Sequence, residues 1–312
     1  MRLSYDIVVV GAGHAGAEAA SAAARLGSRT LLITIDMEKI ASMSCNPAVG
    51  GVAKGQIVRE IDALGGQMAR ITDQSAIQFR MLNRSKGAAM WSPRAQCDKS
   101  EFSRLWRRTL ENTRNLYLWQ DSVTEILLDH TGEKVAVRGV KTRMGVEIEC
   151  RRVVLTAGTF LGGLMHCGTN SAEGGRAGDE ASHGITEQLV SLGFESGRMK
   201  TGTPARLDAR TINFDALEVQ EGDIEPSKFS YDADTQVVKH QLPCFMVYTS
   251  KAVHDILREG FDRSPLFNGT ISGIGPRYCP SIEDKLRTFA DKEQHQLFLE
   301  PEGRSTNEYY LN

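Results

Sequence analysis

Cysteines, prolines and long apolar runs are all scarce in this sequence. It holds six cysteines and nine prolines among 312 residues. Six dispersed cysteines build no disulfide framework, which indicates a reducing compartment and excludes a secreted disulfide scaffold. The longest stretch of low charge, residues 7–24, is interrupted by His14 and Glu18, so we expect no membrane span and no membrane partner. Since the N-terminus carries no secretory signal, the sequence predicts a cytoplasmic protein.

An excess of charge of one sign is also lacking. The chain has 37 basic and 39 acidic residues, which gives a net charge of −2. This balance excludes a generally basic nucleic-acid coat but leaves room for a local basic patch. No cluster of candidate metal ligands stands out, so no metal is expected. Glycine, in contrast, is abundant with 30 residues, which suits a fold whose backbone closely approaches a ligand.

A strand, a glycine-rich turn and a helix follow one another at the N-terminus. We predict strands at Tyr5–Val10 and Thr30–Ile35 and a helix at Ala17–Leu26, a β-turn-α-β unit that begins a doubly wound parallel sheet. The turn has the GxGxxG pattern, in which the helix N-terminus binds a pyrophosphate. Asp36, just beyond the second strand, is expected either to reach a ribose or to lie in a surface loop. The candidate cofactor residues of the turn are Gly11, Ala12, Gly13, His14, Ala15 and Gly16.

The next strands favour FAD over a plain nicotinamide cofactor. Residues 123–129, 135–142 and 146–150 predict an antiparallel meander, and Val153–Ala157 is an apolar strand that ends in Thr-Ala-Gly. This order resembles the FAD domain of glutathione-reductase-like flavoproteins. We therefore predict an α/β fold with an FAD-binding Rossmann-type sheet, a meander and an inserted α+β domain. Val123 is expected to present its backbone to the adenine, or alternatively only to pack.

Two cysteines are predicted to stand directly before helices. Cys45 precedes a helix predicted over Asn46–Leu64, and Cys279 precedes one that Ser281 and Asp284 predict by their capping spacing. A helix N-terminus favours the thiolate, so both are candidate catalytic residues. Flavin disulfide reductases have a CxxxxC pair at the position of Cys45, whereas this segment has one cysteine. The alternative for each is a structural cysteine.

The charge distribution divides the chain further. Residues 206–239 carry four basic and eight acidic residues, and we predict an inserted domain at 201–272, between an FAD-binding domain at 1–200 and a return to it at 273–312. Residues 80–114 carry nine basic and three acidic residues, which would suit RNA phosphates or a solvated helix face. A helix over 98–114 would bury Phe102, Leu105, Trp106 and Leu110, leaving as candidate RNA contacts Arg104, Arg107 and Arg108.

Four sequence blocks occur in this order: GAGHAGAEAA at 11–20, MSCNPAVGGVAKGQIVREIDALGG at 43–66, GGRAGD at 174–179 and GPRYCPSIEDK at 275–285. Together they resemble the MnmG (GidA) family of tRNA uridine 5-carboxymethylaminomethyl modification enzymes. The resemblance implies an FAD- and NADH-dependent enzyme that adds an aminomethyl-type group to C5 of the wobble uridine of tRNA. It also implies methylene-tetrahydrofolate as carbon donor, the GTPase MnmE as partner, and a homodimer that forms a heterotetramer with MnmE.

The resemblance further assigns site residues. It makes Cys45 and Cys279 the cysteines needed for activity, and it adds Val123 and Ser182 to the turn as FAD contacts. It also places a nicotinamide-nucleotide segment at Gly275, Pro276, Arg277, Tyr278, Cys279, Pro280, Ser281, Ile282, Glu283, Asp284, Lys285, Leu286, Arg287, Thr288 and Phe289.

The chain departs from the family in length, since the family is about twice as long. This chain is expected to stop before the family's last FAD-binding motif and before the helical C-terminal domain that meets the GTPase. We therefore expect weak FAD binding and no partner binding by this chain alone. The competing class is a flavin-dependent disulfide reductase or dehydrogenase of a small molecule, and a third is a non-enzymatic flavin- or RNA-binding module. The missing CxxxxC pair and the missing second GxGxxG count against the reductase.

Overall fold

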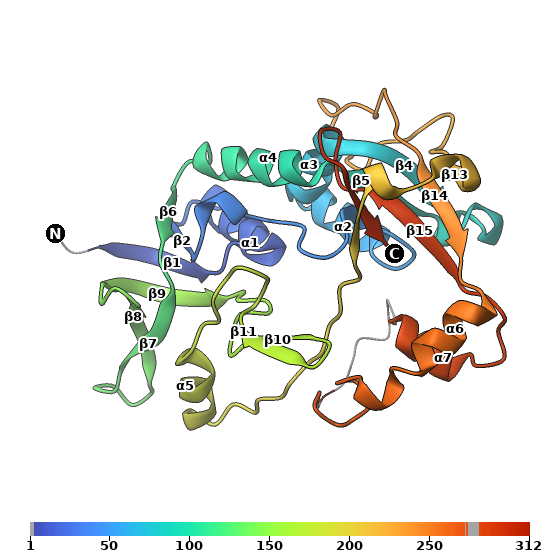
Figure 1. Ribbon diagram of the computed structural model, residues 1–312. Helices are drawn as coiled ribbons and strands as arrows, with labels where there is room; N and C mark the ends of the chain where they lie inside the picture. The colour runs from blue at the N-terminus through green and yellow to red at the C-terminus, as the bar shows by residue number, and fades with distance from the viewer. Residues whose placement is uncertain (1–2, 272, 274–280) are drawn as a thin grey trace.

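A computed structural model of the chain describes residues 3–271, 273 and 281–312 (Figure 1). Its N-terminal half is built on a six-stranded sheet of order β6-β2-β1-β9-β8-β7. The first four strands in this order are parallel, and β9, β8 and β7 pair antiparallel. The predicted parallel sheet with a meander is thus confirmed. The bounds are β1 Ser4–Val10, β2 Thr30–Thr34, β6 Leu116–Gln120, β7 Val123–Asp129, β8 Ala136–Thr142 and β9 Glu147–Leu155.

One strand replaces two predicted ones. Residues 146–150 and 153–157 were expected as separate strands, but β9 runs unbroken and serves both sheet directions. Its first residues pair antiparallel with β8, as in Glu149 with Gly139. Its later residues pair parallel with β1, as in Val153 with Val8. The exposed arginines at 151 and 152 interrupt the apolar pattern but not the backbone pairing.

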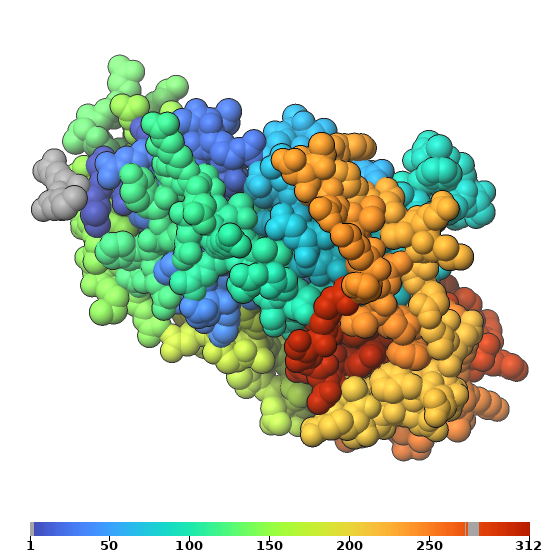
Figure 2. Space-filling model, turned by 90° about the horizontal axis from the view of Figure 1, so that it is seen from above, coloured from blue at the N-terminus to red at the C-terminus, as the bar shows by residue number. Residues whose placement is uncertain are grey.

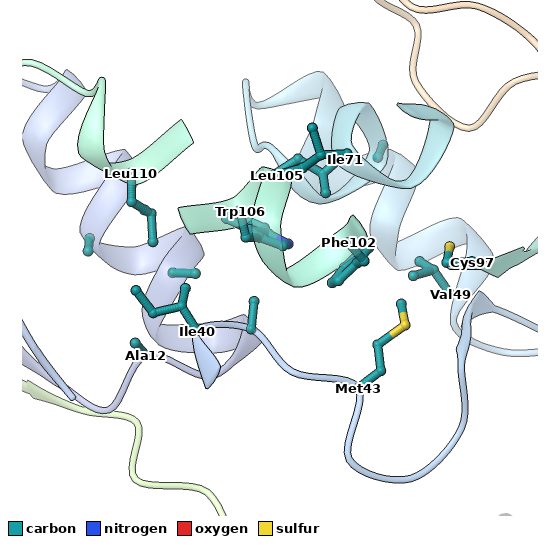
Figure 3. Packing of buried hydrophobic residues seen from close by; sticks show 14 of the residues in the cluster. Ala12, Ile40, Met43, Val49, Ile71, Cys97, Phe102, Leu105, Trp106 and Leu110 are labelled. Atoms are coloured by element: carbon teal, nitrogen blue, oxygen red, sulfur yellow. The ribbon is translucent and has the colours of Figure 1, made fainter. Parts of the chain in front are cut away.

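The sheet is covered on both faces because side chains alternate along each strand. Val9 and Leu32 face helix α1 (His14–Arg25) and helix α4 (Lys99–Glu111), whereas Val8 and Leu31 face the meander and helix α5 (Ile185–Ser191). Helix α4 forms as predicted, and Asp98 caps it by accepting from Glu101 N at 3.0 Å. Its buried side chains lie between α1 and α3 (Met68–Ser75), with Leu105 beside Ile71 in Figure 3: Phe102, Leu105, Trp106 and Leu110.

The segment after Cys45 is not the predicted helix. Residues 48–50 form strand β3 (Ala48–Gly50), which pairs with β5 (Ser92–Cys97), and β5 pairs with β4 (Ala76–Leu82). Gly50 and Gly51 have φ of +85° and +107°, a conformation that ends any helix. Helix α2 therefore starts only at Gly55 (Gly55–Ala63), and α3 (Met68–Ser75) follows. The Asn46-Pro47 pair predicted a helix start, but the residues that follow it pair with β5 as a strand.

The C-terminal half contains a five-stranded antiparallel sheet of order β12-β16-β15-β14-β13. Its last strands in the chain, β15 and β16, pair with strands of the 201–272 stretch rather than with the parallel sheet. The domain boundaries at 201 and 273 stay a prediction. The bounds are β12 Arg206–Asp208, β13 Glu218–Gln220, β14 Cys244–Tyr248, β15 Gln296–Pro301 and β16 Glu308–Leu311.

The remaining elements are short. Helices α6 (Lys251–Arg258) and α7 (Ile282–Thr288) lie together beside this sheet (Figure 1), and Ser281 caps α7 as predicted by accepting from Asp284 N at 3.2 Å. No helix among residues 3–271, 273 and 281–312 is long and apolar enough to cross a membrane. The other elements are β10 Leu164–Cys167, β11 Asn170–Glu173, and the 3₁₀ turns η1 Met37–Lys39, η2 Arg84–Lys86, η3 Ala88–Met90, η4 Ala209–Thr211, η5 Phe214–Ala216 and η6 Phe261–Arg263.

The β3-β5-β4 sheet and the five-stranded sheet are joined by polar side chains. Gln78 Nε2 donates to Gln220 O and Leu242 O at 3.0 Å each, and Gln96 Nε2 donates to Pro301 O at 3.1 Å. From above, the blue-to-green parallel-sheet lobe lies at one end of an elongated body and the orange and red strands lie at the other (Figure 2). This packing places β16 next to the loop that carries Cys45.

Candidate functional site

The β1–α1 turn packs tightly at two of its three glycines. Gly11 has φ of +97°, and a Cβ there would lie 2.6 Å from Thr156 O at the end of β9. A Cβ on Gly16 would overlap Gly11 O and lie 2.6 Å from Thr156 Oγ1. A Cβ on Gly13, in contrast, would meet nothing within 4 Å. The turn is therefore closed on the protein side and open at Gly13, where a ligand can approach the backbone.

The N-terminus of α1 is free to receive an anion. Its N-cap residue is Gly13, no side chain caps it, and its first turn has no acidic residue. The unpaired N–H groups and the positive end of the helix thus fit a pyrophosphate. His14 adds no cation, because burial lowers the pKa of its imidazole more than the bond from Nε2 to Ala41 O, at 3.0 Å, raises it. The residues present fit the diphosphate of FAD.

Val123 and Ser182 are brought together although 59 residues separate them. Ser182 Oγ donates to Val123 O at 3.3 Å, and Ser182 N donates to Phe160 O at 2.7 Å. The loop that contains Phe160 begins at Thr156, whose hydroxyl donates to Gly11 O at 2.8 Å. Both residues therefore lie near the carboxyl edge of the parallel sheet, on the side of the glycine turn. Their contact with FAD stays a prediction.

Asp36 caps a 3₁₀ turn. Its Oδ1 accepts from Glu38 N at 2.8 Å, and its Oδ2 lies 3.4 Å from Lys39 Nζ. Half-exposed, it belongs to the surface loop that was one of the two expectations. Its approach to a ribose stays a prediction.

The loop from β2 to Cys45 is docked on the glycine turn. Ala41 N donates to Ala12 O at 2.8 Å. Further along, Ser44 Oγ accepts from Arg176 Nη1 at 3.1 Å, and Arg176 Nε pairs with Asp179 at 2.6 Å. Burial would raise the pKa of Asp179, but its bonds to Lys39 and Arg176 outweigh this effect and lower it. A charged cluster thus fixes the backbone that leads to Cys45.

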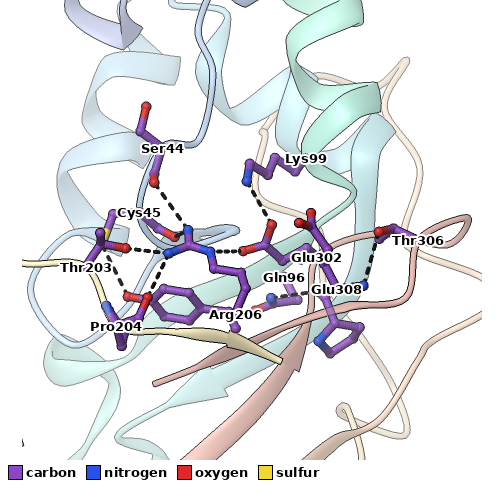
Figure 4. Close-up of polar contacts among 12 residues, drawn as sticks. Ser44, Cys45, Gln96, Lys99, Thr203, Pro204, Arg206, Glu302, Thr306 and Glu308 are labelled. Atoms are coloured by element: carbon purple, nitrogen blue, oxygen red, sulfur yellow. Dashed lines mark hydrogen bonds and ion pairs between the residues drawn. The ribbon is translucent and has the colours of Figure 1, made fainter. Parts of the chain in front are cut away.

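Cys45 lies between the two halves of the chain. Its Sγ is 3.2 Å from Tyr310 OH and 3.6 Å from Gly202 O. Arg206 Nη2 donates to Cys45 O at 2.6 Å (Figure 4). The expected helix N-terminus at Cys45 is wrong, because the chain continues into β3. The cysteine is instead held by a tyrosine hydroxyl and an arginine that come from β16 and β12.

The second candidate cysteine, Cys279, lies outside the described residues, as do residues 275–280 of the predicted nicotinamide segment. Residues 281–289 are described and consist of α7 with its flanking residues. Lys200 Nζ lies 3.3 Å from Asp284 Oδ2, which ties α7 to the chain two residues before Gly202. The nicotinamide assignment and the role of Cys279 stay predictions.

The three candidate RNA arginines differ in their surroundings. Arg104 pairs with Glu101 at 2.5 Å, and Arg107 pairs with Glu111 at 2.9 Å. Arg108 is exposed and forms no ion pair within the part of the chain that the structure describes. The three arginines line a surface depression together with Ser42, three residues before Cys45, and Lys99, which pairs with Glu302. Two of the three positive charges are thus partly neutralised by their own helix.

Sequence reasoning missed the residues that surround Cys45. Tyr310 and Arg206 are separated from Cys45 by 265 and 161 residues, and Glu302 and Lys99 complete their network. No spacing or local motif connects such positions, so the only signal is their meeting in space.

Comparisons with known proteins agree with this fold. The family model described as glucose inhibited division protein A matches residues 6–312. The chain is 62% identical to the tRNA uridine 5-carboxymethylaminomethyl modification enzyme MnmG of Parabacteroides distasonis and 61% to that of Porphyromonas gingivalis, covering 100% of this chain and 49% of each relative. The crystal form I structure of Aquifex aeolicus GidA matches with a TM-score of 0.92 and 48% identity, over 99% of this chain and 52% of that one. The chain thus spans about half the length of the curated relatives it matches.

Proposed function

The chain belongs to the glucose-inhibited division protein A family, and from this membership we propose that it acts in modifying the wobble uridine of tRNA. The reaction proposed is the addition of a carboxymethylaminomethyl-type group to C5. The observation that carries the proposal is the docking of the loop that leads to Cys45 on the dinucleotide-binding turn, through Ala41 N and Ala12 O, in a chain about 60% identical to enzymes of that name.

The chemistry requires a nucleophile. C5 of uridine becomes reactive once a nucleophile adds at C6: the new S–C6 bond forms, and the C5=C6 electron pair moves to C5 and O4. A thiolate suits this step, and elimination later restores both the C5=C6 bond and the thiolate. Cys45 is half-buried and has a hydrogen-bond donor beside its sulfur. Cys279 is the second candidate for the same step.

FAD would be held by the residues whose geometry fits its diphosphate: Gly11, Gly13 and the first N–H groups of α1. When bound, a flavin supplies hydride transfer or carriage of a one-carbon unit. We further propose NADH as reductant, methylene-tetrahydrofolate as carbon donor, the GTPase MnmE as partner, a homodimer within a heterotetramer, and a cytoplasmic location. These follow from the family resemblance alone.

The flavin-dependent disulfide reductase is not favoured. Its chemistry needs two cysteines within bonding distance, whereas the hydrogen-bond partners of Cys45 Sγ among the described residues are the Tyr310 hydroxyl and Gly202 O. The comparisons likewise point to tRNA modification.

The proposal is tested in cells that lack the gene. Nucleoside analysis of their tRNA is expected to show unmodified wobble uridine, and the intact gene should restore the modification. Wild-type modification in the deleted strain, with no second copy of the gene present, would contradict the proposal.

The basic helix gives a prediction on RNA binding. We expect Arg108→Ala to weaken tRNA binding and to reduce the slope of log K against log salt by roughly one, since one unpaired cation is lost. Arg104→Ala and Arg107→Ala should each change the slope less, because Glu101, Glu111 and Glu38 partly neutralise them. Binding is measured by fluorescence anisotropy at several salt concentrations.

The control is Arg210→Ala in the acidic segment, where Arg210 pairs with Asp208, and it should leave the slope unchanged. If Arg108→Ala and Arg210→Ala behave alike, α4 is a solvated face and not an RNA contact.

A further inference from the structure

Tyr310 lies beside Cys45, the candidate nucleophile. It is the third residue of β16 and only 3% exposed. Its hydroxyl lies 3.2 Å from Cys45 Sγ, and the Arg206 guanidinium stacks over its ring at 4.8 Å. Burial raises the pKa of Tyr310, so the hydroxyl keeps its proton at neutral pH. Tyr310 therefore presents a proton to the sulfur.

The arginine that stacks on Tyr310 is itself fixed. Glu302 is 2% exposed, and its two carboxylate oxygens accept from Arg206 Nε and Lys99 Nζ at 2.8 Å each (Figure 4). The same arginine donates to Ser44 O and Cys45 O, at 3.2 Å and 2.6 Å. A single guanidinium thus holds the Cys45 backbone on one side and the Tyr310 ring on the other.

The sulfur has one partner for each of its protonation states. As a thiol it can donate to Gly202 O at 3.6 Å, and as a thiolate it can accept from the Tyr310 hydroxyl. The released proton goes to water, since Cys45 is half-exposed, while Tyr310 keeps its own. Nothing in this arrangement requires a helix N-terminus.

We propose that Tyr310 is a positioning residue that holds the Cys45 thiolate by a hydrogen bond, with Arg206 and Glu302 fixing its ring. Its part in catalysis rests on the proposed function, in which Cys45 is a candidate nucleophile. The hydrogen bond itself does not depend on that function.

The test compares Tyr310→Phe with the wild-type 312-residue chain. Alkylation of Cys45 by iodoacetamide is followed across pH by mass spectrometry of the peptide that contains it. Losing a hydrogen bond to a charged group shifts its ionisation by roughly tenfold. The more basic thiolate is about threefold more nucleophilic, which offsets part of this loss. We therefore expect Tyr310→Phe to react about threefold more slowly near neutral pH and about threefold faster at high pH.

The crossing of the two curves is the decisive sign, because a merely structural role would move the whole curve in one direction. The matched control is Tyr309→Phe, whose ring packs against Phe214 and Phe245 and not against Cys45, and which should leave the curve unchanged. Cys167, exposed in β10, serves as an internal reference in every sample.

Parallel curves, or a Tyr310→Phe variant that fails to fold while Tyr309→Phe folds, would overturn the proposal, since the hydroxyl would then serve only the fold. Because alkylation uses no tRNA, this result stands even if Cys45 is found unnecessary for modification. If the proposed function also holds, Tyr310→Phe should lower the rate of tRNA modification and move its pH profile to higher pH.

Discussion

The Gly16→Ala variant is expected to lose about 3 kcal/mol of folding stability and to bind FAD poorly. The added methyl group would overlap Gly11 O and lie 2.6 Å from Thr156 Oγ1, and Gly11 is itself packed on the end of β9. Forcing an atom into a closely packed site typically costs 1–3 kcal/mol, and here both obstacles belong to the turn or to its support. The variant should therefore lose both folding stability and FAD affinity.

Gly13→Ala is the matched comparison. Its φ of −68° suits alanine, and no atom lies within 4 Å of the new Cβ. Stability should change by no more than about 1 kcal/mol, the usual effect at an N-cap. FAD binding should nevertheless weaken about a hundredfold, roughly 2.7 kcal/mol, because the methyl group occupies the space through which the diphosphate approaches.

Thermal or urea unfolding of the two variants gives the stabilities, and flavin fluorescence titration gives the affinities. Equal stabilities for Gly16→Ala and wild type would show that the turn has room for a Cβ at this position. Unchanged FAD affinity in Gly13→Ala would show that the diphosphate lies elsewhere.

The second large effect is expected at Cys45. Cys45→Ser should lower tRNA modification by at least about a thousandfold, because a serine hydroxyl is hardly ionised at neutral pH while its size and hydrogen bonding resemble those of the thiol. Cells that carry only the variant gene are analysed for modified wobble uridine. Cys167→Ser, at the exposed end of β10, is the matched control and should retain modification.

A trapping experiment separates the two candidate cysteines. With 5-fluorouridine at the wobble position and the carbon donor present, C5 bonds to the transferred carbon and carries fluorine in place of the proton that elimination removes. The S–C6 bond should therefore remain. We expect the adduct on Cys45, identified by peptide mass spectrometry and absent in Cys45→Ser. An adduct on Cys279, with Cys45→Ser still forming it, would assign the nucleophile to the other cysteine.

Much of the fold follows from local patterns in the sequence. The β1-turn-α1-β2 unit and helix α4 form as predicted, because a strand of consecutive apolar residues, three glycines and a 3.6-residue apolar period each report on residues close in the chain. Ser281 likewise caps α7 through a residue three positions away. These features depend on backbone conformation within one turn or strand.

The surroundings of Cys45 depend instead on contacts across the whole chain. The Asn46-Pro47 pair satisfies the local rule for a helix start, but pairing of β3 with β5 and the positive φ of Gly50 and Gly51 prevail. The sequence by itself determined the glycine turn and the sheet it begins, and it made Cys45 a candidate nucleophile. Only the tertiary structure decided what touches that sulfur, because Tyr310 and Arg206 reach it through a sheet whose strands come from distant parts of the chain, and such contacts leave no periodic trace in the sequence.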